Sequence, residues 1–312
     1  MIEPINLRQL RYLVAVDDFR HFGQAAKACN VSQPSLSAQI RQVEERLGFA
    51  IFDRGRRAIE PTPGGQQVIA RARRVLAEMD RLVAETLPGN APLSGPFHLG
   101  VIPTIAPYLL PRILPALRRL ASDLKLYLIE ETTDRLLERL RRGTVDAAIL
   151  ALPIDEQRFR TVPLYDEPFL AAVPGDHRLA TRETLSVEDL KGEAVLLLED
   201  GHCFRDHALA VCRQAGTRDA GFDAASLTTL CEMVSGGLGT TLIPALAARG
   251  ASEGRVTIPF AEPTPSRRVG FVWPDGSGRR RTAAAVSAML QTLVPDALGT
   301  AVRPLPAGVS AV

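Results

Sequence analysis

The first fifty residues carry the pattern that most constrains how this chain folds. Apolar residues recur at helical spacing between Leu7 and Val16, which predicts a first helix, and a second short helix covers residues 22–29. After a tight turn, Ser32 is a good N-cap for a third helix over residues 33–47, which Gly48 ends. Two short helices, a turn and a capped third helix predict a helix-turn-helix, whose last helix enters the major groove of DNA. A generic helical bundle with a solvated polar face is the alternative.

The polar face of the third helix and the segment that follows supply the candidate contacts to DNA. Small side chains let the backbone approach the bases, and Arg41 is long enough to reach a base edge or a phosphate. Residues 52–59 predict a short hairpin with three arginines around Gly55, a wing that would grip phosphates or the minor groove. A solvated charged turn is the alternative for that hairpin. The candidate DNA-binding residues are Gln33, Pro34, Ser35, Ser37, Ala38, Arg41, Arg54, Arg56 and Arg57.

A long helix is expected to start at Thr62 and Pro63 and to end near Leu87. It carries an apolar seam at alternating spacings of three and four, which is typical of helices that pair in a dimer; the alternative is a single helix packed on its own domain. Prolines and glycines then predict a hinge. We therefore expect a winged helix-turn-helix over residues 1–62, a dimerisation helix over 63–88, a hinge over 89–96 and a regulatory domain over 97–312. The seam residues are Ile69, Ala72, Leu76, Met79 and Val83.

Composition and charge narrow the class of protein. The chain has 312 residues, 46% of them hydrophobic, which suits two or three globular domains. No apolar run is long enough for a membrane span, and the first residues lack a secretory core, so we expect a cytoplasmic protein without a membrane partner. Four cysteines do not make a disulfide scaffold. Lys and Arg outnumber Asp and Glu over residues 1–88, which favours a polyanionic partner there.

Beyond the hinge, strand and helix signals alternate. Strands are expected over residues 97–102, 124–130 and 145–150, with helices over 107–120 and 134–142 between them. Such alternation is typical of an α/β domain with mostly parallel strands.

Two cysteines nine residues apart, Cys203 and Cys212, suggest redox chemistry. His202 and Arg205 flank the first one, and a nearby cation favours the reactive thiolate. A second cysteine within reach captures an oxidised first one as a disulfide. On one intact helix the two would lie about 13.5 Å apart along the axis, whereas a disulfide needs Cα atoms within about 7 Å, so oxidation would require this segment to rearrange.

Plainer interpretations of the same segment stay open. Both cysteines could be inert and buried, as we expect for Cys29 and Cys231 on apolar helix faces. A metal site built from His202, Cys203, His207 and Cys212 matches no standard zinc spacing.

The chain resembles the LysR-type transcriptional regulators, over about residues 7–293. The matching residues in the first part are Ala25-Ala26, Val31 to Ser37, Ile40, Glu44, Leu47-Gly48, Phe52, Arg54 and Thr62 to Gly65. The effector region is similar to the members that respond to hydrogen peroxide, at residues 100–104, 107–111, 198–206, 243–246 and Cys212. Phe204, where an aliphatic residue is usual, and His207, in place of an uncharged side chain, depart from that pattern.

This resemblance implies a two-lobed, periplasmic-binding-protein-like α/β regulatory domain. Lobe I would comprise residues 97–168 and 266–294 and lobe II residues 169–265, with a mobile tail over 295–312. Ligands of such folds sit between the lobes.

The resemblance also implies a chemistry. Peroxide would oxidise Cys203 to a sulfenic acid, and Cys212 would resolve it as a disulfide. The residues carried over to surround Cys203 are His202, Thr104, Arg267, Thr133 and Asp206. Each has a plainer alternative, because Thr133 and Asp206 are also suited to capping helices and Arg267 to a surface position.

The implied partners are double-stranded operator DNA, hydrogen peroxide, RNA polymerase, and a thiol reductant such as glutaredoxin or thioredoxin. The chain would pair with itself, as a dimer through helix 63–88 and as a homotetramer, near the nucleoid. No cofactor and no metal are implied, and the chain would not be an enzyme. Two rivals remain, a LysR-type regulator of a small organic effector, which needs no cysteine pair, and a thiol peroxidase, which needs no helix-turn-helix.

Overall fold

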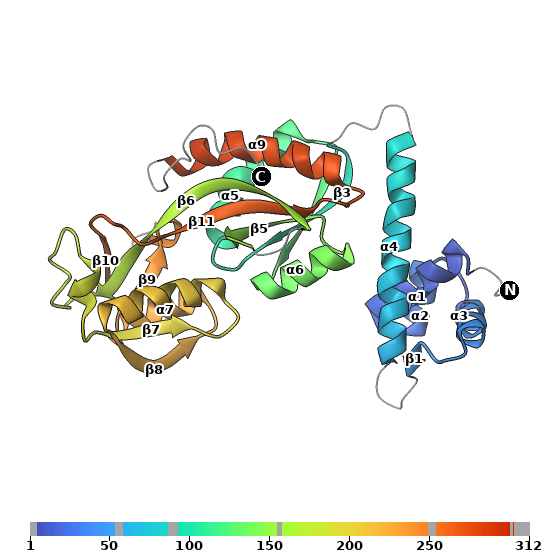
Figure 1. Ribbon diagram of the computed structural model, residues 1–312, viewed down its shortest axis with the longest axis horizontal. Coiled ribbons are helices and arrows are strands. Elements are labelled where there is room, and N and C mark those ends of the chain that lie inside the picture. The colour runs from blue at the N-terminus through green and yellow to red at the C-terminus, as the bar shows by residue number, and fades with distance from the viewer. Residues whose placement is uncertain are drawn as a thin grey trace. The chain divides into compact units, whose positions relative to one another are not determined.

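The computed structural model (Figure 1) describes residues 5–53, 59–86, 93–154, 158–248, 254–299 and 302. The chain divides into two compact units, one made chiefly of the residues up to Asn90 and the other of most residues that follow. Within the described residues no helix is long and apolar enough to cross a membrane.

The first unit is a small helical domain with a two-stranded hairpin. Its elements are α1 (Leu7–Phe19), α2 (Phe22–Ala28), α3 (Gln33–Leu47), β1 (Phe52–Asp53), β2 (Glu60–Pro61) and α4 (Pro63–Thr86). The predicted third helix is confirmed as α3. Ser32 Oγ accepts a hydrogen bond from the Ser35 amide, and Gly48 ends the helix with a φ of 78°, which a glycine adopts without strain.

The hairpin after α3 is held by hydrogen bonds from its backbone amides to the Glu44 side chain. β1 and β2 pair antiparallel, with Phe52 opposite Pro61. Glu44 Oε1 accepts hydrogen bonds from the amides of Ile51 and Phe52, at 2.8 and 3.2 Å, and so ties α3 to the hairpin. A Cβ on Gly65 would lie 2.0 Å from the Ile51 carbonyl oxygen, so the start of α4 approaches this segment as only glycine allows. The candidate contacts Arg54, Arg56 and Arg57 lie outside the described residues.

The first half of the α4 seam packs within its own unit. Ile69 and Ala72 are buried, and Ile69 belongs to the core formed with α1 and α3. Arg73 on the same helix forms ion pairs with Asp17, at 2.9 Å, and with Asp18. The alternative of a helix packed on its own domain therefore holds for this half of the seam.

The second unit is an α/β domain built around a long mixed sheet. Its elements are β3 (Gly95–Val101), α5 (Ala106–Leu120), β4 (Leu124–Glu130), α6 (Thr133–Arg142), β5 (Ala147–Leu152), β6 (Phe159–Pro174), η1 (Val187–Leu190), β7 (Ala194–Leu198), α7 (Cys203–Ala215), β8 (Arg218–Ala224), α8 (Leu227–Ser235), β9 (Thr241–Pro244), η2 (Ala245–Ala248), β10 (Arg255–Pro259), β11 (Ser266–Pro274) and α9 (Arg280–Leu298). α9 lies along one face of the β6–β11 region and α6 along the opposite face (Figure 1).

The expectation of mostly parallel strands is wrong for part of this sheet. In the described chain the order is β10-β6-β11-β5-β3-β4, with β9 also paired to β6. β3 pairs parallel with β4 and β5, but β11 pairs antiparallel with both β5 and β6. The reason is that β6 leads the chain away from β3, β4 and β5, and β11 brings it back to them. The two strands therefore run in opposite directions.

Two hydrophobic cores lie along β6. Phe159, Val162 and Tyr165 belong to the core shared with β3, β5 and α9, whereas Phe169 and Val173 belong to the core shared with β7, α7 and α8. We call the parts around these cores lobe I and lobe II.

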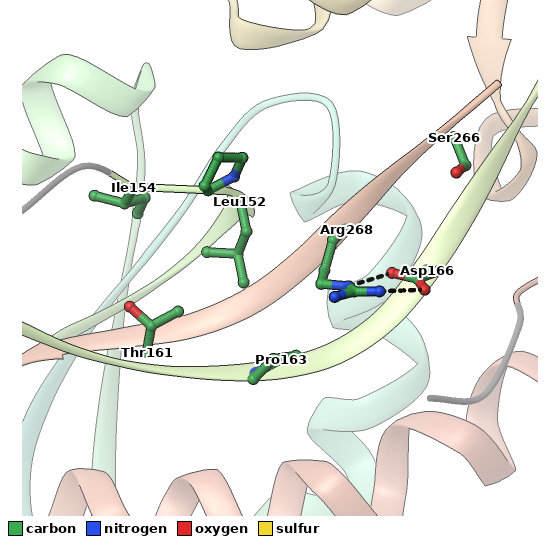
Figure 2. A pocket seen from close by; sticks show the side chains of 8 residues that line it. Leu152, Ile154, Thr161, Pro163, Asp166, Ser266 and Arg268 are labelled. Atoms are coloured by element: carbon green, nitrogen blue, oxygen red, sulfur yellow. Dashed lines mark hydrogen bonds and ion pairs between the residues drawn. The ribbon is translucent and has the colours of Figure 1, made fainter. Parts of the chain in front are cut away.

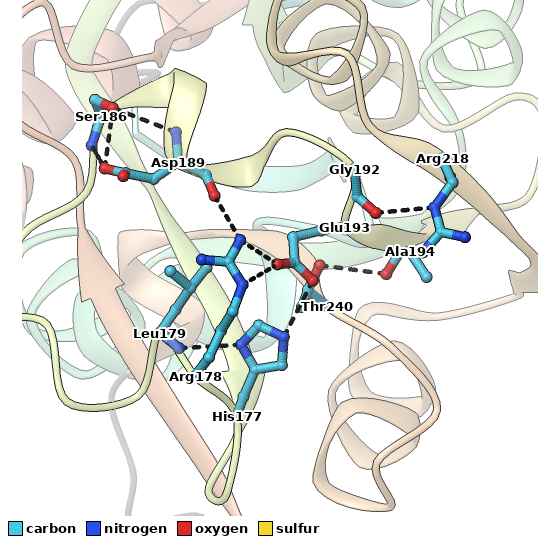
Figure 3. Close-up of polar contacts among 10 residues, drawn as sticks. All are labelled: His177, Arg178, Leu179, Ser186, Asp189, Gly192, Glu193, Ala194, Arg218 and Thr240. Atoms are coloured by element: carbon cyan, nitrogen blue, oxygen red, sulfur yellow. Dashed lines mark hydrogen bonds and ion pairs between the residues drawn. The ribbon is translucent and has the colours of Figure 1, made fainter.

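Polar contacts fix the loops of lobe II (Figure 3). His177 and Arg178 both contact the Glu193 carboxylate, His177 Nε2 at 3.1 Å and Arg178 Nε at 2.9 Å. Asp189 and Ser186 form a reciprocal cap at the start of η1.

Two expected boundaries need correction. The hinge was expected to reach residue 96, but β3 begins at Gly95 and pairs with β4 there; residues 89–92 of that hinge lie outside the described residues. The tail was expected to start at residue 295, but α9 continues to Leu298, which is fully buried together with Val294. Apolar residues at helical spacing carry the helix on past Pro295.

Candidate functional site

Cys203 is the first residue of α7 and lies at the boundary of the two lobes. It is partly buried and packs against the core of lobe I, although α7 itself belongs to lobe II. The N-terminal end of a helix carries unpaired amide groups and a partial positive charge, which favours an anion such as a thiolate.

Cys212 lies on the opposite face of the same helix. Nine residues correspond to about two and a half turns, so the two side chains leave α7 on opposite sides. Cys212 is accordingly buried in the core of lobe II. All four cysteines of the chain are free thiols in this structure. A bond between Cys203 and Cys212 therefore requires the helix between them to unwind.

Arg267 is the buried cation of the site. It comes from β11, and its side chain is fully enclosed. Its guanidinium donates to Glu167 Oε2 at 2.8 Å, to Thr104 Oγ1 at 2.7 Å and to the Thr104 carbonyl at 3.0 Å. It also lies 5.4 Å from the centroid of the Phe204 ring, a cation–π geometry. The plainer alternative, in which Arg267 is a surface charge, is thereby excluded, and Phe204 gains a contact that an aliphatic side chain cannot make.

The charges around Arg267 are coupled. Burial opposes its charge, but Glu167, Cys203 and Tyr165 raise the pKa of Arg267, so the guanidinium stays protonated. Cys203 is thus close enough to interact electrostatically with this cation. Burial, with Glu167 added, raises the pKa of Tyr165 well above its ordinary value, so its hydroxyl stays neutral.

Sequence analysis missed Glu167, which is fully buried opposite Arg267. Its other carboxylate oxygen accepts a hydrogen bond from the Leu246 amide at 3.1 Å. A signal was available, because Asp166 and Glu167 are adjacent on a strand and must point to opposite faces. One of the two had to enter the core, where it needs a partner.

Arg205, expected beside Cys203, points elsewhere. Its guanidinium contacts Asp200 at 2.9 Å and Asp223 at 2.7 Å, and it donates to the Leu198 carbonyl. These contacts hold the loop before α7 against β8. The buried cation whose charge interacts with Cys203 is Arg267, which is 64 residues further along the chain than Cys203.

The other carried-over residues are placed unequally. His202 is the N-cap residue of α7, but its side chain makes no cap hydrogen bond. Thr104 is buried against Arg267, and Thr133 begins α6 with a buried hydroxyl that has no hydrogen-bond partner in the described chain. Asp206 is exposed on the first turn of α7, and its place beside the thiol stays a prediction.

Burial acts against ionisation of the other three cysteines. Burial raises the pKa of Cys212, partly offset by a hydrogen bond from Thr217. Burial also raises the pKa values of Cys231 and Cys29. These thiols are poor nucleophiles while they stay enclosed.

The structure also bears on a metal site and on a pocket. Among the described residues no group of three or more His, Cys, Asp and Glu is placed to hold a metal ion, and Cys212 faces away from Cys203. One open pocket of about 470 Å³ lies where β5, β6 and β11 meet (Figure 2). The paired Arg268 and Asp166 form one wall of it, and its lining contains none of the carried-over site residues.

The candidate DNA face is the outer side of α3. Leu36, Ile40 and Val43 are buried under it. The side chains on the other side are free to meet a ligand, and Arg41 is held loosely by Ser37, at 3.5 Å. The exposed positions are Gln33, Pro34, Ser35, Ala38 and Arg41, with Ser37 partly buried.

Comparison with known proteins decides the family. Residues 7–66 match the bacterial regulatory helix-turn-helix protein family of the lysR type, and residues 90–295 match the LysR substrate binding domain. This chain belongs to the LysR family. It is a DNA-binding regulator rather than an enzyme. The recognised helices and the two-lobed α/β domain are therefore those of a LysR regulator.

Among its relatives are several named OxyR. The DNA-binding transcriptional dual regulator OxyR of Escherichia coli is 44% identical over 279 residues, covering 88% of this chain and 92% of that protein. A full-length OxyR from Pseudomonas aeruginosa with a cysteine replaced by aspartate superposes with a TM-score of 0.83 at 35% identity, covering 99% and 100% of the two chains. A Corynebacterium glutamicum OxyR variant with hydrogen peroxide bound gives a TM-score of 0.65 at 33% identity, with 96% of both chains covered.

Proposed function

We propose that this LysR regulator senses hydrogen peroxide through Cys203 and transmits the signal as a disulfide with Cys212. The observation that carries the proposal is the placement of Cys203 at the N-terminus of α7, within the field of the buried Arg267. Its partner cysteine is on the same helix but on the opposite face. Relatives named for peroxide support the choice of ligand.

The chemistry needs only groups of this chain and one peroxide. The Cys203 thiolate attacks one peroxide oxygen, the O–O bond breaks, and hydroxide leaves and takes up a proton as water. Sulfur is oxidised to a sulfenic acid and peroxide is reduced. Cys212 then attacks that sulfur, its proton leaves with the hydroxyl group as a second water, and a disulfide forms. Thr104, Thr133 and His202 would donate hydrogen bonds to the peroxide oxygens.

The conformational signal follows from geometry. Closing the disulfide pulls Cys212 out of the core of lobe II and unwinds α7, which biases the regulatory domain toward a second state. We propose that this state changes how helix-turn-helix domains engage operator DNA. A thiol reductant such as glutaredoxin or thioredoxin would return the protein to the dithiol form.

Assembly and partners complete the proposal. The domain limits stay as expected apart from the corrections at residues 95–96 and 295–298. A dimer through helix 63–88, assembled into a homotetramer, would present paired helices to a DNA half-site pair. RNA polymerase would be the partner that reads the altered complex, in the cytoplasm near the nucleoid.

Single-cysteine variants test the proposal. Wild type treated with stoichiometric peroxide should lose two thiols, and mass spectrometry should find a Cys203–Cys212 disulfide. Cys203→Ser should lose none. Cys212→Ser should stop at a sulfenic acid on Cys203 or pass to sulfinic acid, without the new proteolytic cleavage near Arg205 and Arg213 that oxidation exposes in wild type. Cys231→Ser, a buried cysteine of the same lobe, should behave as wild type.

The outcomes separate the alternatives. Equal oxidation of all four cysteines would contradict the assignment of Cys203. An unoxidised Cys203 together with an operator footprint that changes only on adding a small organic acid would favour the metabolite-sensing reading instead. An identical footprint change in Cys212→Ser would make the sulfenic acid, rather than the disulfide, the signal.

A further inference from the structure

His207 stands one helical turn after Cys203 on α7. Side chains four residues apart on a helix are neighbours on one face. The positions that enter the core of lobe II are a different set on this helix, namely Phe204, Ala208, Val211, Cys212 and Ala215. Cys203, which packs against the core of lobe I, and His207 are therefore neighbours on α7 outside the set that fills the core of lobe II.

The surroundings of His207 leave its imidazole unused by the fold. Its Nδ1 is buried and has no hydrogen-bond partner in the described chain. The centroid of the His207 ring lies 6.1 Å from that of the Phe169 ring, and the centroids of the Phe169 and Phe204 rings lie 5.1 Å apart. A buried nitrogen without a partner is costly unless something else, such as a bound ligand or water, satisfies it.

The charged groups facing this imidazole are few. The charges that act on it are those of Arg267, from β11, and of Asp206, on α7 itself, and the ring of Phe169 from β6 is an apolar neighbour. Burial and the charge of Arg267 lower the pKa of His207, and Asp206 only partly offsets them. At neutral pH the imidazole is therefore neutral and able to accept a proton. The charge of Arg267 also interacts with Cys203, so the same cation acts on both side chains.

We propose that His207 is a catalytic residue, the proton carrier for the reaction of Cys203 with peroxide. This inference rests on the proposed function. The imidazole takes the thiol proton from Cys203, the sulfur attacks peroxide, and the imidazolium gives the proton to the departing hydroxide. Thiol and hydrogen peroxide become sulfenic acid and water, and His207 ends as it began.

The location makes His207 a better carrier than the two arginines considered for this site, Arg267 and Arg205. An imidazolium formed beside Arg267 is repelled and gives up its proton readily. Arg267 remains protonated and so cannot take the thiol proton. Arg205 is engaged with Asp200 and Asp223.

The test uses the full chain with Cys212→Ser, so that the reaction stops at Cys203. Its second-order rate constant with hydrogen peroxide is measured by stopped flow between pH 5 and 8, with and without His207→Gln. Glutamine keeps a polar, uncharged side chain but cannot carry a proton. General acid–base catalysis contributes typically 10²–10⁴-fold, so His207→Gln should be about 100-fold slower at pH 7. The matched control is His98→Gln, a half-exposed histidine on β3 stacked on Tyr127, which should react as its parent does.

The pH profile excludes a merely structural effect. With His207 present the rate should fall as pH drops through a value below the ordinary histidine pKa of 6.5, because protonation there blocks the base. That break should be absent from His207→Gln. If His207→Gln does not fold, as judged by DNA binding, the break in the parent profile and a solvent deuterium isotope effect decide alone. A parent without that break, or a folded His207→Gln within about twofold of it, would overturn the inference. Failure of Cys203 to react in the parent would instead overturn the proposed function.

Discussion

At the scale of single residues, the site is organised by one buried ion pair. Arg267 and Glu167 face each other across β11 and β6, and both side chains are fully enclosed. Such a pair is not in itself a source of large stability, because desolvation offsets the attraction. Removing one partner is different, since it leaves an uncompensated charge in the core. Arg267 is thereby fixed at Thr104, where its charge interacts with Cys203.

Glu167→Gln should therefore be strongly destabilising. The change conserves shape but leaves Arg267 without its counter-charge, and we expect a loss of about 3–5 kcal/mol in the free energy of unfolding. Trp273, the single tryptophan of the chain, lies on β11 and reports unfolding of this unit by fluorescence in urea. The matched control is Asp166→Asn next door, which breaks a solvent-accessible pair with Arg268 and should cost at most about 1 kcal/mol. Equal losses in the two variants would contradict a special role for the buried pair.

At the scale of elements, α7 is the part that must change. An intact helix keeps Cys203 and Cys212 on opposite faces, so its local stability opposes the disulfide. Between the two cysteines, one face of α7 is exposed to solvent. A substitution on that face can weaken the helix without changing the hydrophobic core of either lobe.

Ala210→Gly should speed disulfide closure. Ala210 is exposed between the two cysteines, and glycine in a helix interior is about 1 kcal/mol less favourable than alanine. If the unwound segment is the reactive one, closure after peroxide addition should become about fivefold faster, because 1.4 kcal/mol corresponds to about tenfold. Non-reducing mass spectrometry on quenched samples measures the rate.

Gln214→Gly controls for a general weakening of α7. Gln214 is exposed on the same helix but follows Cys212, outside the segment that has to open. It should leave the closure rate nearly unchanged. Similar acceleration in both variants would show that the whole helix detaches, rather than the stretch between the cysteines.

Elements with local signals were the predictable ones. The ends of α3 follow from Ser32 and Gly48, and the strand and helix order of lobe I follows from spacing alone. The direction of β11, the partners of Arg205 and the pairing of Glu167 with Arg267 were not predictable, because each joins segments far apart in the chain. Family resemblance named Thr104 and Arg267 together, and these two side chains are in contact, whereas the places of Thr133, His202 and Asp206 around Cys203 stay predictions. In the sequence, Cys203 was singled out by His202 and Arg205, and in the structure Arg205 pairs with Asp200 and Asp223 instead.

At the scale of the whole molecule, recognition of DNA and sensing lie in two separate compact units. The buried ion pair, α7, Cys203 and Cys212 belong to the second. The helix-turn-helix has its own core, closed by Ile69 of α4. Substitutions on the DNA face should therefore change affinity without changing the reaction of Cys203 with peroxide.

Arg41→Ala tests that division and the assignment of α3. Arg41 is exposed on the side of α3 away from Leu36 and Ile40, whereas Arg74 is exposed on α4, outside the proposed DNA face. Loss of a base contact should weaken operator binding by about 1–3 kcal/mol and reduce the preference for operator over unrelated DNA. Arg74→Ala should bind nearly as wild type does, and both variants should oxidise at the wild-type rate.

Titrations by fluorescence anisotropy at several salt concentrations separate two modes of contact. A loss that is uniform over all sequences, with a salt slope smaller by about 0.9, would mean that Arg41 meets a phosphate. Unchanged affinity would mean that another face of the first unit meets DNA.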